Sequence, residues 1–239
     1  NATRPQLTRD QVADHARTYL EQAGLILDMD RVEVVHNSQW FDRLTFMDSI
    51  KLGAGMTVAR MLERDMFADR FKAGVPIGIH EFLYPLMQGR DSVEIESDVE
   101  IGGTDQTFNL LVGRDLMRDA GMEPQVCVTL PILPGVDGIQ KMSKSLGNAV
   151  GLTDEPREMF GKVMSIPDNV MGDYFRLATD TSEERIAALL AGPPREAKAA
   201  LAAAVVDVYH GPGAGEAAAE EFDRIFRDKG LPDEIPESD

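Results

Sequence analysis

Residues 98–106 read D-V-E-I-G-G-T-D-Q, and residues 124–130 read P-Q-V-C-V-T-L. Both stretches are short, rich in β-branched residues and bounded by turn residues, which predicts two strands, the second of them buried. The sequence between the two predicted strands predicts a helix from Thr104 to Gly121. A strand, a helix and a second strand in this order build a parallel sheet with a crossover helix. The sequence therefore predicts an α/β fold with half of a doubly wound parallel sheet.

The sequence before residue 98 predicts further helices and a strand. We expect a helix that begins with a capping box at Thr8 and a strand at residues 32–35. Residues 41–72 are expected to be helical with breaks near Gly53 and Gly55, and residues 80–89 are expected to form another helix.

After Asp154 the sequence changes to helical segments separated by Pro or Gly. A proline suits the first position of a helix, and alanine-rich segments such as Glu196 to Tyr209 favour helix formation. We therefore expect two domains, residues 1–154 with the parallel sheet and residues 155–239 wholly helical. The helical segments are expected to begin at Pro156, Asp168, Ser182 and Pro194, and a last one is expected from Glu216 to Arg227.

The composition is that of an ordinary folded chain with an acidic excess. Its 239 residues include 24 Lys and Arg against 41 Asp and Glu, for a net charge of −17. This charge argues against non-specific coating of nucleic acid, although a local basic patch remains compatible with it. The single Cys127 excludes an intramolecular disulfide and suits a reducing, cytoplasmic location. Because no run of about 18 apolar residues and no basic leader is present, we expect neither a membrane span nor export.

Residues 141–148 read K-M-S-K-S-L-G-N and follow a turn-rich loop. Lys141, Ser143 and Lys144 would place two ammonium groups and a hydroxyl on a mobile segment. Such a segment can close over a triphosphate and neutralise the charge that builds on departing pyrophosphate. The alternative is a solvated loop that happens to carry two lysines.

The end of the first strand is a second candidate site. Gly103 lets the backbone approach a ligand closely, and strand ends are where open α/β sheets bind ligands. Asp105 can accept hydrogen bonds from a ribose, and Gln106 can donate to a carboxylate or a phosphate. The alternative is that Asp105 only caps the following helix in a tight turn.

Tyr84, Gln88 and Asp91 are spaced i, i+4 and i+7, which places them on one face of the predicted helix. Facing a cavity, they could hold an ammonium group and a phenolic hydroxyl. A solvated helix face is the alternative. The four histidines have no metal-ligand spacing, so we expect no metal site built from protein side chains.

Together these segments resemble the bacterial tyrosyl-tRNA synthetase family of class I aminoacyl-tRNA synthetases. The matching text includes T-R-P-Q-L-T at the start, H-E-F-L-Y-P-L-M-Q-G-R-D-S-V from His80, D-V-E-I-G-G-T-D-Q from Asp98 and K-M-S-K-S-L-G-N from Lys141. The resemblance covers essentially the whole chain. It implies that residues 1–154 are the C-terminal part of a Rossmann-like catalytic domain including the K-M-S-K-S loop, and that residues 155–239 are the helical anticodon-side domain.

The resemblance also implies a role for each candidate residue. The family holds the amino group of tyrosine at the positions of Tyr84 and Gln88, and its phenolic hydroxyl at the position of Asp91. Gly103 and Asp105 match residues that contact the ribose, and Gln106 matches a residue near the tyrosine carboxylate and the α-phosphate. Leu133 lies where the family packs adenine. Lys141 and Lys144, with Ser143 between them, match the loop that stabilises departing pyrophosphate.

The family implies ATP with Mg²⁺ as co-substrate, L-tyrosine and tRNA(Tyr) as further substrates, and a homodimer. The family's H-x-G-H half would precede Asn1, and the RNA-binding module of many bacterial members would follow Asp239. The chain therefore reads as a piece of a longer protein, and we expect it to be inactive alone. Two alternatives are a non-catalytic tRNA-binding or dimerising fragment and an unrelated α/β hydrolase-like domain, although the sequence has no G-x-S-x-G.

Overall fold

The computed structural model describes residues 8–143 and 146–226, and its contacts divide the chain into two units. One unit is Val34–Ile132, and the other combines Asn1–Glu33 with Leu133–Asp239. This division differs in position from the predicted boundary after residue 154. The assignment of a catalytic domain to residues 1–154 and of a helical domain to residues 155–239 stays a prediction.

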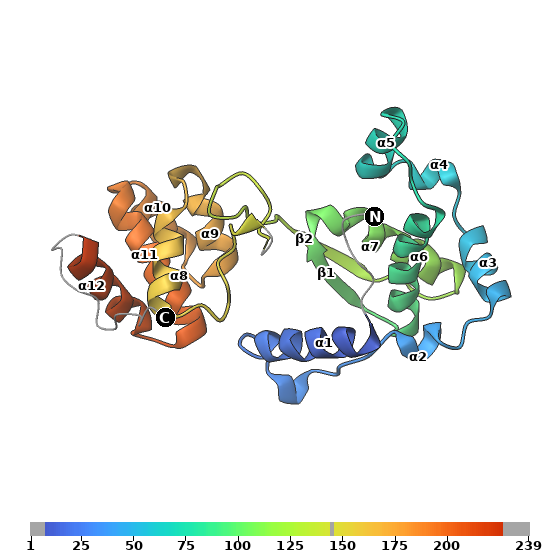
Figure 1. Cartoon of the computed structure of the whole chain (residues 1–239), viewed down its shortest axis with the longest axis horizontal. Coiled ribbons are helices and arrows are strands. Elements are labelled where there is room, and N and C mark those ends of the chain that lie inside the picture. Colours follow the sequence, from blue (N-terminus) through green and yellow to red (C-terminus); the bar gives the residue numbers. More distant parts are fainter. Residues whose placement is uncertain (1–7, 144–145, 227–239) are drawn as a thin grey trace. The chain divides into compact units, whose positions relative to one another are not determined.

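The unit Val34–Ile132 contains the predicted parallel sheet (Figure 1). Strand β1, Val99–Gly103, pairs in parallel with β2, Val126–Leu130, with Val99 opposite Val126 and Gly103 opposite Leu130. The chain between the strands forms a 3₁₀ turn and then helix α7, as predicted from the sequence. The unit's other elements are α2 Ser38–Phe41, α3 Phe46–Ala54, α4 Val58–Met61, α5 Asp65–Lys72, α6 Ile79–Glu94, the 3₁₀ turn Thr104–Gln106 and α7 Thr107–Asp119.

Helices α6 and α7 pack against each other through two glycines. A Cβ added at Gly89 would lie 2.9 Å from Leu116 Cδ1 and 3.1 Å from the backbone N of Gly113. A Cβ added at Gly113 would lie 2.7 Å from Ser92 Oγ. Since a side chain at Gly89 would meet the backbone of Gly113, glycine here serves close approach of two backbones. Helix α6 continues through Gly89 to Glu94, beyond its predicted end at residue 89.

Two predictions about strands are wrong. Residues 32–35 follow a 3₁₀ turn, Met29–Arg31, and form no strand. A β-branched run becomes a strand only where a neighbouring strand can pair with its backbone, and the described residues offer it none. Strand β2 is also not buried, since Val126 is 59% exposed and Leu130 is 47% exposed. Burial of a parallel strand requires cover on both faces of the sheet.

The other unit is helical in its described part. The predicted capping box is confirmed at the start of α1, Arg9–Ala23, where Gln11 N donates to Thr8 Oγ1 and Thr8 N donates to Gln11 Oε1. The helices predicted after residue 154 are also confirmed. They are α8 Pro156–Ser165, the 3₁₀ turn Asp168–Val170, α9 Met171–Ala178, α10 Glu183–Leu190, α11 Pro194–His210 and α12 Ala214–Phe226.

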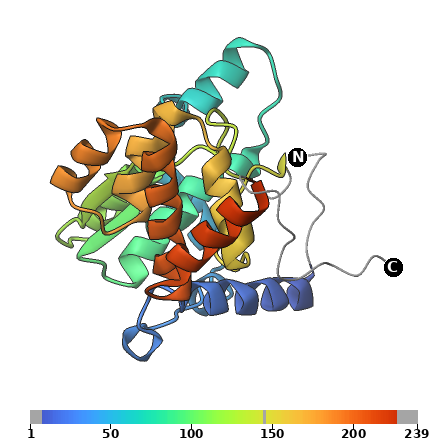
Figure 2. The same cartoon turned by 90° about the vertical axis from the view of Figure 1, so that its left-hand side faces the viewer.

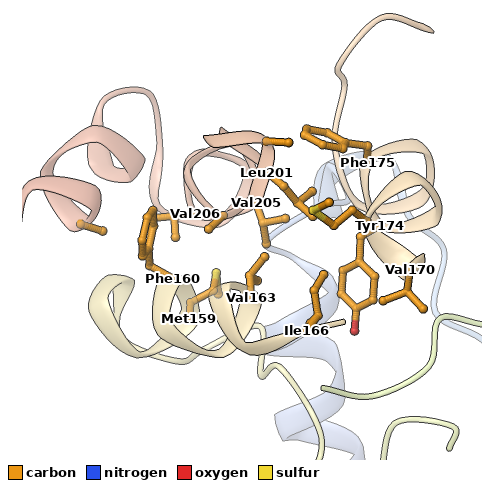
Figure 3. Close-up of a cluster of buried hydrophobic side chains, with 14 of the residues drawn as sticks. Met159, Phe160, Val163, Ile166, Val170, Tyr174, Phe175, Leu201, Val205 and Val206 are labelled. Atoms are coloured by element: carbon orange, nitrogen blue, oxygen red, sulfur yellow. The ribbon is translucent and has the colours of Figure 1, made fainter. Parts of the chain in front are cut away.

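A continuous apolar core holds these helices together. Helices α8, α11 and α12 lie side by side in both views (Figures 1 and 2). Their buried side chains meet those of α9 and α10 in one cluster, part of which is shown in Figure 3. Its members that are at most 1% exposed are Met159, Phe160, Val163, Ile166, Phe175, Ile186, Ala197, Leu201, Ala202 and Val206.

Candidate functional site

Helix α6 carries Tyr84, Gln88 and Asp91, so their predicted placement on one helix is confirmed. Their environments differ. Tyr84 is 60% exposed, whereas Gln88 and Asp91 are partly buried. The helix therefore presents a phenol to solvent at one turn and less accessible polar groups at the next two.

The carboxylate of Asp91 accepts two hydrogen bonds from the segment around α2. Trp40 Nε1 donates to Oδ1 at 2.9 Å, and Asn37 Nδ2 donates to Oδ2 at 3.4 Å. Partial burial raises the pKa of Asp91; the bonds from Trp40 and Asn37 oppose this, and the negative charge of Glu100 adds to the rise. Each carboxylate oxygen has a second lone pair, so Asp91 can still accept from a ligand hydroxyl.

The end of β1 brings Gly103, Asp105 and Gln106 together. A Cβ at Gly103 would lie 2.8 Å from Asp105 Oδ1 and 3.0 Å from Ile132 Cγ1. Glycine at this position therefore leaves room for the carboxylate over the strand end. Asp105 lies in the 3₁₀ turn Thr104–Gln106, directly before the start of α7. Its ribose contact and the helix-capping alternative both stay predictions.

The structure joins these two groups of residues through Asn109, which the sequence did not single out. Asn109 Nδ2 donates to Gln88 Oε1 on α6 and to Gln106 Oε1 after β1, each at 2.9 Å. Asn109 is only 1% exposed. The signal available in the sequence was an amide three residues after Gln106, between the apolar Phe108 and Leu110.

The K-M-S-K-S loop belongs to the other unit, and a buried asparagine holds its base. Asn148 is 5% exposed; its Oδ1 accepts from Ser143 N at 2.8 Å, and its Nδ2 donates to Asp137 Oδ2 at 2.9 Å and to the carbonyl of Lys141 at 3.3 Å. Hydrogen bonds from the Ile139 N–H, the Asn148 amide and the Gln140 N–H lower the pKa of Asp137. The hydrogen bonds of the Asn148 side chain therefore hold the start of the loop in place.

The other predicted loop residues have separate positions. Lys141 is exposed and forms an antiparallel bridge with Pro134. Leu133 is partly buried and packs against the helical core, rather than standing open at a strand end. Lys144 lies outside the described residues.

Among residues 8–143 and 146–226, no group of three His, Cys, Asp or Glu side chains is arranged to hold a metal ion. Within the same ranges, no helix is long and apolar enough to cross a membrane.

Comparison with known proteins gives a consistent result. The family model described as "tRNA synthetases class I (W and Y)" matches residues 1–227. Tyrosine–tRNA ligases from Carboxydothermus hydrogenoformans and Thermotoga maritima are each 52% identical to the chain, over 98% and 99% of its length. The matched regions are 59% and 60% of those two proteins, so the chain spans about three fifths of their length.

Solved structures support the same fold. The tyrosyl-tRNA synthetase of Archaeoglobus fulgidus, solved in complex with L-tyrosine, aligns with a TM-score of 0.66 over 89% of this chain and 75% of its own. A truncated mitochondrial tyrosyl-tRNA synthetase of Aspergillus nidulans aligns with a TM-score of 0.67 over 93% and 71%. At 22% and 20% identity these matches concern the fold alone: a Rossmann-like parallel sheet followed by helices.

Proposed function

The chain belongs to the family of class I tRNA synthetases for tryptophan and tyrosine, and on this basis we propose that it is part of a tyrosine–tRNA ligase. The parent protein would activate L-tyrosine with ATP and transfer it to tRNA(Tyr). The observation that carries the proposal is the bridge from Gln88 through Asn109 to Gln106, at 2.9 Å on each side. It connects the helix assigned to tyrosine with the strand end assigned to the nucleotide.

In this proposal α6 binds the amino acid. Asp91 accepts the phenolic hydrogen of tyrosine while Trp40 and Asn37 hold its carboxylate in place. Tyr84 and Gln88 accept from the ammonium group through their oxygens. Because the pKa of Asp91 is raised mainly by burial, a bound hydroxyl also supplies a partner to a carboxylate that has lost some of its water.

The strand end would then position the reacting groups. Gln106 donates to the tyrosine carboxylate and the α-phosphate, and Gly103 and Asp105 contact the ribose. A carboxylate oxygen attacks the α-phosphorus, the bond to the bridging oxygen breaks, and pyrophosphate departs with its electrons. A terminal ribose hydroxyl of tRNA next attacks the tyrosyl carbonyl and releases AMP.

We assign the phosphate side to the K-M-S-K-S loop. Lys141, Ser143 and Lys144 would neutralise the charge on departing pyrophosphate, and Leu133 would pack near adenine. Mg²⁺ typically binds through substrate phosphates with few protein ligands, which suits a chain whose assigned residues include no carboxylate cluster. We place the reaction in the cytoplasm, where a lone thiol such as Cys127 remains reduced.

We also propose that the protein acts as a homodimer through the Val34–Ile132 unit. Phe46 and Ile79 are 82% and 83% exposed. An apolar groove of about 380 Å³ lies beside α5 and the start of α6, lined by Val58, Leu62, Phe71, Gly74, Val75, Pro76, Ile77 and Phe82. Exposed apolar surface of this kind marks interaction sites. The same surface favours the second candidate function, a dimerising fragment without catalysis of its own.

Tyrosine-dependent exchange of pyrophosphate into ATP tests the proposed function. Because the relatives are longer, the assay compares this chain with a chimera in which it replaces the matching part of the Thermotoga maritima ligase. We expect exchange from the chimera and none from the chain alone. A folded chimera without exchange would contradict the proposal and favour the non-catalytic alternative.

Asp91→Ala in the chimera tests the substrate. Removing the acceptor should lower the preference for tyrosine over phenylalanine by about tenfold or more, since a buried polar group left unpaired costs about 1–3 kcal/mol. The KM for ATP should change little, and Asp69→Ala, at an exposed acid on α5, is the control. Equal losses for tyrosine and ATP would refute the assignment of Asp91 to the phenol.

A further inference from the structure

We infer that Asn109 is a positioning residue that sets the orientation of both substrate-facing amides, Gln88 and Gln106. This inference rests on the proposed function, because it concerns the residues assigned to the tyrosine amino and carboxylate groups. It assigns no contact with substrate to Asn109 itself.

The structure assigns a direction to each hydrogen bond. Asn109 Nδ2 carries two N–H groups, and it lies 2.9 Å from Gln88 Oε1 and 2.9 Å from Gln106 Oε1. Both protons are therefore used, one for each glutamine. Each glutamine turns its oxygen toward Asn109, and its Nε2, on the opposite side of the same planar group, points elsewhere.

This orientation matches what each amide has to do. Gln106 offers its Nε2 protons to an anion, as binding of a carboxylate requires. Had the amide turned over, a partly negative oxygen would face the carboxylate and repel it. Gln88 Oε1 keeps a second lone pair, which can accept from an ammonium group while Asn109 occupies the first.

Only one side of the Asn109 amide is satisfied by hydrogen bonds. Asn109 is 1% exposed, and its Oδ1 is buried with no hydrogen-bond partner among the described residues. A buried acceptor without a partner costs free energy that an apolar side chain of similar size would avoid. The donor side of the amide is therefore the useful side, and its use is the orientation of the two glutamines.

The decisive substitution is Asn109→Asp, which keeps the shape but removes both donors. An ionised aspartate can only accept, so it would draw the Nε2 of both glutamines toward itself and turn the Gln106 oxygen outward. Ser92→Ala is the matched control. Ser92 is also 1% exposed and belongs to the same buried polar region, but its hydroxyl donates to Glu100 at 2.5 Å and not to either glutamine side chain.

The measurement compares the affinities of the full-length chimera for L-tyrosine and L-tyrosinol. Tyrosinol has a hydroxymethyl group in place of the carboxylate but keeps the ammonium and the phenol, so the ratio of affinities isolates the carboxylate contact. We expect the preference for tyrosine to fall about tenfold to a hundredfold in Asn109→Asp, the equivalent of one charge-assisted hydrogen bond. The ratio should be unchanged in Ser92→Ala.

A second variant and a measurement on the unaltered protein guard against misfolding. Asn109→Ala leaves Gln106 free to rotate and should lower the same ratio. In the unaltered protein, NMR should find that the Asn109 amide protons exchange with solvent more slowly than those of the exposed Gln39. If the unaltered chimera binds neither ligand, the proposed function fails and this inference with it. If it binds both, while folded Asn109→Asp keeps the tyrosine-to-tyrosinol ratio or the Asn109 protons exchange as fast as those of Gln39, only the positioning role is overturned.

Discussion

At the scale of single residues, Tyr174 links the base of the K-M-S-K-S loop to the helical core. Its hydroxyl donates to the carbonyl of Pro134 at 2.6 Å, and the residue is 2% exposed. Burial, together with the negative charge of Asp137, raises the pKa of Tyr174 to about 12. The hydrogen bond requires the protonated phenol, so this contact depends on pH.

Tyr174→Phe should weaken the link and also reduce its pH dependence. Near neutral pH the variant should lose about 0.5–1.5 kcal/mol of unfolding free energy, the usual net contribution of a hydrogen bond. As the pH rises from 10 to about 12, the unfolded phenol ionises before the folded one, so the unaltered chain loses stability that the variant does not have. Urea unfolding at pH 8, 10 and 11.5 measures both effects.

Tyr19→Phe is the control, because that phenol is 73% exposed. Its stability should follow that of the unaltered chain at every pH. If Tyr174→Phe did the same between pH 10 and 12, the buried phenol would not be a source of the alkaline loss.

The sequence singles out some residues of the candidate site and misses others. The spacing of Tyr84, Gln88 and Asp91 could be read because a helix repeats its faces locally. Asn109 could not be identified, since one of its two partners, Gln88, is 21 residues away. Trp40, which lies 51 residues from Asp91, was missed for the same reason. A hydrogen bond between distant residues leaves no periodic signal in the sequence.

At the scale of elements, α11 is the central helix of the helical core. It contacts α8, α9, α10 and α12, and Figure 3 shows its Leu201, Val205 and Val206 facing the side chains of α8 and α9. Its many alanines allow neighbouring helices to approach closely, so the large side chains that remain fill the space between them.

Leu201→Ala should therefore destabilise the helical core strongly. Leu201 is 0% exposed, and truncation of a fully buried leucine costs about 2–5 kcal/mol through lost burial and the cavity left behind. Hydrogen exchange of the α11 backbone under native conditions measures the loss. Leu190→Ala, at a leucine 39% exposed, should cost about 1 kcal/mol or less; equal costs would mean that the core relaxes to fill the cavity.

Helices and strands differ in how far the sequence predicts them. The capping box at Thr8 and the prolines at the starts of α8 and α11 are local signals, and the helices lie where those signals place them. The run at 32–35 has the composition of a strand but forms none. Strand formation and strand burial depend on neighbouring segments, which the amino-acid sequence of one segment does not specify.

At the scale of the whole molecule, exposed apolar side chains mark the surface that we propose as the dimer interface. The Val34–Ile132 unit exposes Phe46, Phe71 and Ile79 at 82%, 66% and 83%. A stable interface buries about 800 Å² on each partner. Phe71 lines the groove beside α5, and Ile79 follows its lining residue Ile77 at the start of α6.

Ile79→Asp should shift the protein toward monomer by raising the dissociation constant of the dimer at least tenfold, since a buried unpaired charge costs roughly 1.4 kcal/mol or more. Sedimentation over a range of concentrations measures the change. Ile139→Asp is the control, because Ile139 is 87% exposed but belongs to the other unit. A dimer that responds only to Ile139→Asp, or to neither substitution, would contradict an interface at the start of α6.

The glycine contact between α6 and α7 also sets a dimension of the proposed substrate site. Gln88 directly precedes Gly89, and Asn109 lies one turn before Gly113. A methyl group at Gly89 would lie 3.1 Å from the Gly113 backbone N, and that contact relaxes only if α6 and α7 separate by a few tenths of an ångström. The absence of a side chain at Gly89 thus keeps the amides of Gln88 and Asn109 within hydrogen-bonding distance across the two helices.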